Sequence, residues 1–148
     1  MALDRPAQGL AAARALLRDE PSPLAAAVAH QTAGIVLRDF GDITEALGEL
    51  RRARTMARAA GDARREADIL STLGAALVMA GQTRRGLATL DDAIRMRPEE
   101  PDARLLVRRA HVHWLLGRNA ETLADAQRAI ALLRGCLLYT SPSPRDRS

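Results

Sequence analysis

The sequence predicts an all-α fold, and three observations support this prediction. Apolar residues recur at helical spacing along most of the 148 residues. Glycines separate the helical stretches at even intervals, and no stretch shows the sustained alternation of apolar and polar residues that is typical of a strand. Hydrophobic residues make up 47% of the chain but aromatic residues only 2%, so the core has to be built from Leu, Ala, Val and Ile.

Seven helices are expected in order along the chain. Their predicted ranges are 6–19, 23–39, 42–60, 62–80, 83–96, 101–116 and 118–134. The glycines that follow helical stretches, where a left-handed C-terminal cap suits glycine, are Gly41, Gly61, Gly81, Gly117 and Gly135. Asp42 and Asp62 come directly after two of these glycines and are expected N-caps. The short connections favour antiparallel neighbours.

Three of the expected helices carry a clear apolar stripe, which predicts a buried face. The stripe of helix 42–60 consists of Ile43, Ala46, Leu47, Leu50, Ala53 and Ala57. The stripe of helix 62–80 consists of Leu70, Leu73, Gly74 and Leu77. The stripe of helix 118–134 consists of Leu123, Ala126, Ile130 and Leu133.

The chain also repeats itself. The segments "GIVLRDFGDITEAL", "GAALVMAGQTRRGL" and "AHVHWLLGRNAETL" align without a gap, and Gly34, Gly74 and Ala110 fall in one column at offsets of 40 and then 36 residues. Three further columns hold Gly41, Gly81 and Gly117; Leu47, Leu87 and Leu123; and Ala53, Ala93 and Ala129. Each repeat corresponds to one helical hairpin. A single hairpin cannot bury its apolar face, so about three stacked hairpins are needed for stability.

This pattern resembles the tetratricopeptide repeat (TPR) family, which has a small residue in the middle of the first helix, glycine at the turn and alanines in the second helix. The middle repeat carries the resemblance through Gly74, Gly81, Leu87, Leu90, Ala93 and Pro98. The third repeat is degenerate, with Thr122 in place of a small residue. The resemblance implies a right-handed α-solenoid of about three TPR-like hairpins (23–61, 62–100 and 101–135) after a leading helix in 1–22 that looks like a partial repeat.

The resemblance also implies a protein–protein interaction scaffold without catalysis, in which the first helices of the hairpins line a concave surface for a protein or peptide partner. The residues that alignment assigns to this groove are Gln31, Arg38, Ser71, Arg104, Arg108, His111 and Trp114, alongside Ile35, Asp68, Ala75 and Val78. A cationic and aromatic face on helix 101–116 suits an acidic or carboxylate-bearing peptide. The alternative, that Trp114 packs against the next helix, stays open.

The sequence indicates no catalytic, cofactor or metal site. His111 and His113 are two residues apart and therefore do not share a helix face, and no Cys, Asp or Glu completes a ligand set with them. His30 is expected to be a partly buried packing residue. No nucleophile–base constellation, phosphate-binding glycine loop or paired catalytic carboxylates can be identified.

The basic residues do not indicate a nucleic-acid partner. The net charge is only +4, and all 22 basic residues are Arg, which is typical of a high-GC bacterial gene. The densest basic stretch contains Arg51, Arg52, Arg54, Arg58, Arg64 and Arg65. It is interrupted by acidic residues and lacks stacking aromatics, which favours solvated helix faces. No apolar run of membrane-spanning length and no signal peptide are present, so we expect a cytoplasmic protein without a membrane partner.

The last residues, 136–148, differ from everything before them. They contain the only Cys and the only Tyr, and "CLLYTSPSPRD" resembles a transposase-type sequencing adaptor translated in one frame. We therefore expect a non-native, disordered tail and a module truncated from a larger protein. A genuine Ser-Pro tail is the alternative.

One finer resemblance concerns the larger protein. The segments "GDARREADILSTLGAALVMAGQTRRGLATLDDAI" and "LLVRRAHVHWLLGRNAETLADAQRAI" resemble the N-terminal repeats of high-GC bacterial proteins that end in a caspase-like CHAT peptidase domain. Two alternatives remain open, namely the TPR sensor region of a multi-domain transcriptional regulator and a small stand-alone TPR adaptor.

Overall fold

The computed structural model describes residues 4–140, and the side chains of residues 4–135. All regular structure in this part of the chain is helical, which confirms the all-α prediction for it. The chain divides into two compact units, Met1–Pro98 and Glu99–Ser148. No helix among the described residues is both long enough and apolar enough to cross a membrane.

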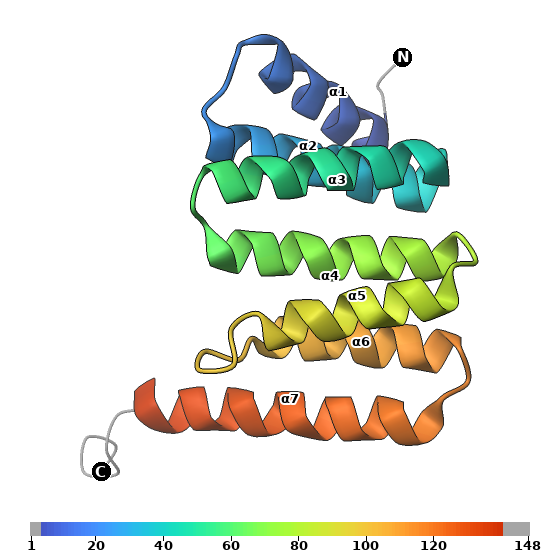
Figure 1. Cartoon of the computed structure of the whole chain (residues 1–148), viewed down its shortest axis with the longest axis vertical. Helices are drawn as coiled ribbons and strands as arrows, with labels where there is room; N and C mark the ends of the chain where they lie inside the picture. The colour runs from blue at the N-terminus through green and yellow to red at the C-terminus, as the bar shows by residue number, and fades with distance from the viewer. Residues whose placement is uncertain (1–3, 141–148) are drawn as a thin grey trace. The chain divides into compact units, whose positions relative to one another are not determined.

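The helices follow one another along the chain with short connections (Figure 1). The first unit contains α1 (Arg5–Arg18), α2 (Pro23–Phe40), α3 (Ile43–Ala59), α4 (Ala63–Met79) and α5 (Thr83–Arg95). The second unit contains α6 (Ala103–Leu115) and α7 (Asn119–Thr140). The predicted bounds of the first six helices agree with these to within two residues at each end.

The predicted end of the seventh helix is wrong. α7 continues through Gly135 to Thr140, so residues 136–140 are helical rather than disordered. Gly135 does not adopt the left-handed conformation that would stop a helix. A glycine inside a helix is tolerated at a penalty of about 1 kcal/mol, so the spacing of glycines alone does not fix a helix end. Residues 141–148 lie outside the described residues, and the adaptor origin of the tail stays a prediction.

The glycine caps are confirmed at three of the other four positions. Gly61, Gly81 and Gly117 have φ angles of +68°, +84° and +71°, a region that residues with a Cβ rarely adopt. Gly41 differs, because its φ is −137° and its backbone N–H donates to the carbonyl of Leu37. The left-handed cap expected at Gly41 is therefore wrong.

The N-caps predicted from sequence are present. The carboxylate of Asp42 accepts a hydrogen bond of 2.9 Å from the backbone N–H of Glu45, and that of Asp62 accepts one of 2.8 Å from Arg65. Each bond satisfies one of the N–H groups that an α-helix leaves unpaired at its start. α5 lacks this feature, because Gln82 at its N-cap makes no side-chain capping bond.

Small residues allow the helices of the first unit to approach closely. A Cβ added to Gly34 on α2 would lie 2.6 Å from the Leu50 side chain on α3. A Cβ added to Gly74 on α4 would lie 2.8 Å from both the Gly86 carbonyl oxygen and the Leu90 side chain on α5. The aligned glycines of two hairpins thus lie at equivalent close contacts between helices.

The core of the first unit is centred on α4, which packs against both α3 and α5 (Figure 1). Its largest cluster is aliphatic and consists of Leu47, Leu50, Leu70, Leu73, Ala76, Leu77 and Ala93. A smaller cluster of Ala13, Ala29 and Ala33 joins α1 to α2. These clusters confirm the apolar stripes predicted for α3 and α4.

The stripe predicted for α7 is not buried. Leu123, Ile130 and Leu133 are 59%, 48% and 52% exposed. The side of α7 that α6 covers instead carries Asp125 and Ala129, which are buried. The buried face is therefore rotated by about one residue from the prediction, because the partner helix, and not the apolar pattern of α7 alone, decides which side is covered.

Candidate partner-binding surfaces

A buried polar network joins α2 to α4 on the side where the sequence places an open groove. The Gln31 side-chain N–H donates to Asp68 at 2.8 Å and to Thr72 at 3.5 Å. The Gln31 side-chain oxygen accepts a bond of 3.2 Å from Arg65. Gln31 is only 5% exposed, so its amide stabilises the contact between the two helices.

Ser71 lies in the same interior region. It is 0% exposed, and its hydroxyl donates to the backbone carbonyl of Asp68 at 2.7 Å. The expectation that Gln31 and Ser71 line an open surface is therefore wrong, because both side chains are buried. Ala75 is buried as well, whereas Ile35 and Val78 are half-buried. Arg38 is half-buried and forms an ion pair with Asp39, its neighbour on α2.

The other four predicted site residues lie on α6, in the second unit. Trp114 is 61% exposed, and its ring lies 5.9 Å from that of His111, also exposed. The Arg104 guanidinium is held by the carboxylate of Asp102 at 2.7 Å, and Arg108 is half-buried and engaged in contacts of its own. His111 and Trp114 thus form an exposed aromatic pair on α6. The neighbouring Arg104 is held in an ion pair with Asp102.

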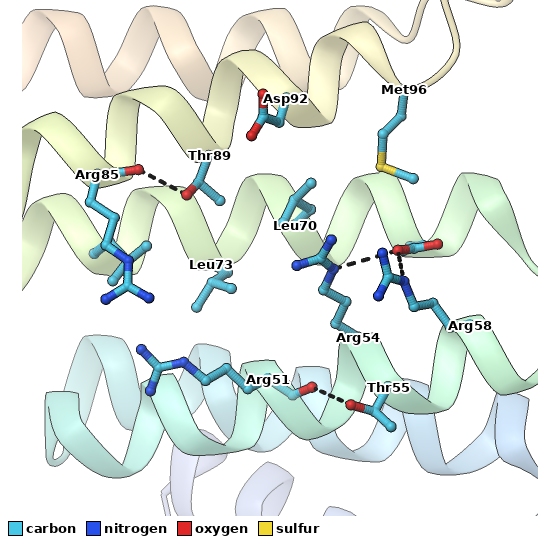
Figure 2. A pocket seen from close by; sticks show the side chains of 12 residues that line it. Arg51, Arg54, Thr55, Arg58, Leu70, Leu73, Arg85, Thr89, Asp92 and Met96 are labelled. Atoms are coloured by element: carbon cyan, nitrogen blue, oxygen red, sulfur yellow. Dashed lines mark hydrogen bonds and ion pairs between the residues drawn. The ribbon is translucent and has the colours of Figure 1, made fainter.

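The first unit has a groove between α3 and α5, and α4 forms its floor (Figure 2). This groove was not identified from the sequence. Its volume is about 600 Å³. The residues lining it are Arg51, Arg54, Thr55 and Arg58 from α3, Glu66, Leu70, Leu73 and Leu77 from α4, and Arg85, Thr89, Asp92 and Met96 from α5. Three consecutive helices therefore form a groove with polar walls and an aliphatic floor.

One end of the groove is closed by a fixed ion cluster. The Glu66 carboxylate accepts from the Arg58 guanidinium at 2.6 Å and from Arg54 at 3.4 Å (Figure 2). The Glu66 side chain is only 12% exposed, so this carboxylate is largely removed from water and needs both cations. Two cations share one carboxylate at this end, so the cluster keeps a single positive charge.

The other end of the groove is more basic. The side chains of Arg51 from α3 and Arg85 from α5 extend toward this end from opposite walls (Figure 2). Within the part of the chain that the structure describes, neither guanidinium forms an ion pair, and the Arg85 guanidinium contacts only the Gln82 amide oxygen at 3.4 Å. This end therefore presents two unneutralised cations.

A signal for this groove exists in the sequence. Arg51, Arg54 and Arg58 are spaced i, i+3, i+7, and therefore share one face of α3. The stretch that contains them is interpreted above as a solvated helix face, an interpretation that fits Arg52, which bonds Glu49 away from the groove. What the sequence does not contain is the position of α5, which places Arg85 opposite the α3 face.

The histidines serve local structure. His30 Nδ1 lies 2.6 Å from the Glu49 carboxylate and the side chain is half-buried, which agrees with the expected packing role. Between residues 4 and 135, no group of three or more His, Cys, Asp or Glu side chains is arranged to hold a metal ion.

The second unit contains a buried ionic cluster between α6 and α7. The Arg109 guanidinium donates two hydrogen bonds of 2.7 Å to the Asp125 carboxylate, a bidentate geometry that gives strong charge-assisted bonds. His113 Nε2 lies 3.9 Å from the same carboxylate, and His113 Nδ1 is buried without a hydrogen-bond partner. These side chains lie inside the hairpin, so they contribute to its structure rather than to its surface.

Comparisons of the chain with known protein families, with curated proteins and with solved structures gave no match.

Proposed function

We propose that this chain is a protein–protein interaction module built from TPR-like helical hairpins, and that it binds a peptide segment of a partner protein. The observation that carries this proposal is the groove on the first unit, which is walled by two helices and floored by a third. Its volume of about 600 Å³ lies within the range of binding sites, and it has a few charged groups around an aliphatic floor.

The repeated packing of the hairpins supports the TPR-like part of the proposal. The contact of Gly34 with Leu50 and that of Gly74 with Leu90 both join residues 16 positions apart (50 − 34 and 90 − 74). Two hairpins with the same close contact are what a stacked repeat requires, because each one needs a neighbour to cover its apolar face. A right-handed solenoid is the arrangement that we propose for such repeats.

The carboxylates of the groove are held by cations of the protein itself. Glu66 is held by two Arg side chains, and Asp92 lies 2.9 Å from the Arg95 guanidinium. The groove thus has groups suited to recognising charge and shape.

Selection from a random peptide library displayed on phage tests this function. We expect the folded protein to enrich peptides that share a consensus, and the same protein unfolded in urea to lose this enrichment, since the groove exists only when the helices pack. No consensus beyond that obtained with an unrelated helical protein would contradict the proposed function.

The identity of the larger protein is a separate proposal, and it rests on the CHAT-type resemblance alone. Resequencing the source locus through the codon for Gly135 tests it. A reading frame that continues into a domain with a His–Cys pair would support the CHAT-type parent. A helix-turn-helix domain would support the transcriptional regulator, and a stop codon directly after the present tail would support the stand-alone adaptor.

A further inference from the structure

We propose that the groove between α3 and α5 binds an acidic segment of the partner protein, with Arg51 and Arg85 as the pair of cations that receives its carboxylates. This inference rests on the proposed function and specifies the chemistry of the partner. It also assigns binding to a surface that includes none of the seven residues expected from sequence.

The groove has a net positive charge. Four Arg and two acidic residues line it, a difference of two positive charges. Glu66 already accepts from Arg54 and Arg58, and Asp92 is paired with Arg95 outside the groove lining. Arg54, Arg58 and Glu66 together keep one positive charge, whereas Arg51 and Arg85 at the other end are two cations that no described carboxylate pairs.

The positions of Arg51 and Arg85 suit two carboxylates of one peptide. The two side chains project from facing walls toward the same end of the groove (Figure 2). A guanidinium offers several N–H donors in a planar fork, which matches the two oxygens of a carboxylate. Two such groups on opposite walls can each receive a carboxylate from one peptide that lies between them.

The other residues that line the groove favour a peptide as the ligand over a nucleic acid. Leu70, Leu73 and Met96 offer aliphatic surface along the groove, which suits an apolar side chain of a peptide. None of the groove-lining residues is aromatic, so bases would have no ring on which to stack.

Fluorescence anisotropy with the full chain tests the inference. The probe is a fluorescein-labelled peptide of alternating Glu and Leu, and its reference is the same peptide with Gln in place of Glu. We expect the Glu peptide to bind more tightly, and R51Q/R85Q to weaken its binding about tenfold, as expected for the loss of two partly exposed charge pairs.

The matched control is R52Q/R84Q. Arg52 and Arg84 precede or follow the groove cations on the same two helices and are exposed, and neither lines the groove. The control removes the same total charge, so we expect its affinity for the Glu peptide to stay within about twofold of the parent protein. Both variants should keep the parent circular dichroism spectrum and unfolding midpoint.

Three results would overturn the inference. They are equal loss of binding in the two double variants, equal binding of the Glu and Gln peptides, and tighter binding of labelled oligo-dT, which would identify a nucleic-acid partner. If phage selection still gives a consensus whose binding R51Q/R85Q does not change, the proposed function survives and the groove assignment fails. If no consensus emerges, the proposed function itself fails.

Discussion

The second and third hairpins share one sequence frame but differ in what holds them together. In the α4–α5 hairpin, Leu73 and Leu77 are buried in an aliphatic cluster. At the positions 36 residues later, the α6–α7 hairpin has Arg109 and His113, which lie against the buried carboxylate of Asp125. Two leucines are thus replaced by an ionic cluster inside the same supersecondary structure.

The contact between the two helices of each hairpin differs in a related way. The second hairpin pairs Gly74 with Leu90, and the equivalent positions of the third carry Ala110 and Ala126. A glycine and a leucine are replaced by two alanines. The comparison teaches that a hairpin of this kind tolerates different interiors if the space between its helices is filled and every buried charge has a partner.

Removing the Asp125 carboxylate should give the largest effect. We expect D125A to destabilise the second unit by about 3 kcal/mol, because Arg109 would lose the bidentate carboxylate that it bonds in a largely buried site. The equivalent change in the second hairpin, T89A, should cost less than about 0.5 kcal/mol, since it removes only a hydroxyl bonded to the Arg85 carbonyl.

Urea unfolding measured by far-UV circular dichroism checks this prediction, because the signal reports the helices of both units. An effect of D125A no larger than that of T89A would show that the ionic cluster does not stabilise the third hairpin.

Replacing the whole cluster should have the opposite sign. The triple variant R109L/H113L/D125T gives the third hairpin the residues that the second has at these three positions. We expect its free energy of unfolding to be about 2 kcal/mol higher than that of the parent chain in the same measurement. Well-packed apolar residues often stabilise more than a buried ion pair, since they avoid the desolvation of the charges. Lower stability than D125A would mean that the third hairpin cannot accommodate an aliphatic interior.

In the second hairpin, Gly74 on α4 lies in close contact with α5. We expect G74A to destabilise the first unit by about 2 kcal/mol, because its Cβ would lie 2.8 Å from the Gly86 backbone and force the helices apart. The control is G48A on α3, where the added Cβ lies 3.6 Å from a flexible Arg52 side chain. This control should gain about 0.5–1 kcal/mol from helix propensity.

Far-UV circular dichroism during thermal unfolding measures both glycine variants. In the third hairpin, A110G should cost about 1 kcal/mol, because glycine is the weaker helix former there. Stabilisation by G74A would disprove the close contact that distinguishes the two hairpins.

The smallest effect concerns a helix start. Asp62 caps α4, whereas Gln82 at the start of α5 makes no capping bond. We expect Q82D to stabilise the second hairpin by about 0.5–1 kcal/mol and D62A to destabilise it by about the same amount. Thermal unfolding of both variants and of the parent chain checks this prediction. If the caps contribute nothing, all three proteins will unfold at the same midpoint temperature.

Local patterns in the sequence determined much of this protein. The helical periodicity predicts six helices to within two residues, Asp42 and Asp62 form the expected caps, and the column of Gly34 and Gly74 marks the close helix contacts. These features are predictable because they depend on a few neighbouring residues and on backbone conformations that only certain side chains favour.

The tertiary structure alone decided which faces are covered and which stay open. It buries Gln31 and Ser71, exposes the apolar stripe of α7, and places Arg85 across a groove from Arg51. Helical spacing assigns residues to a common face, but it does not say which other helix packs against that face. That choice depends on contacts between residues distant in sequence, and here it moves the candidate binding site from the expected surface to the groove between α3 and α5.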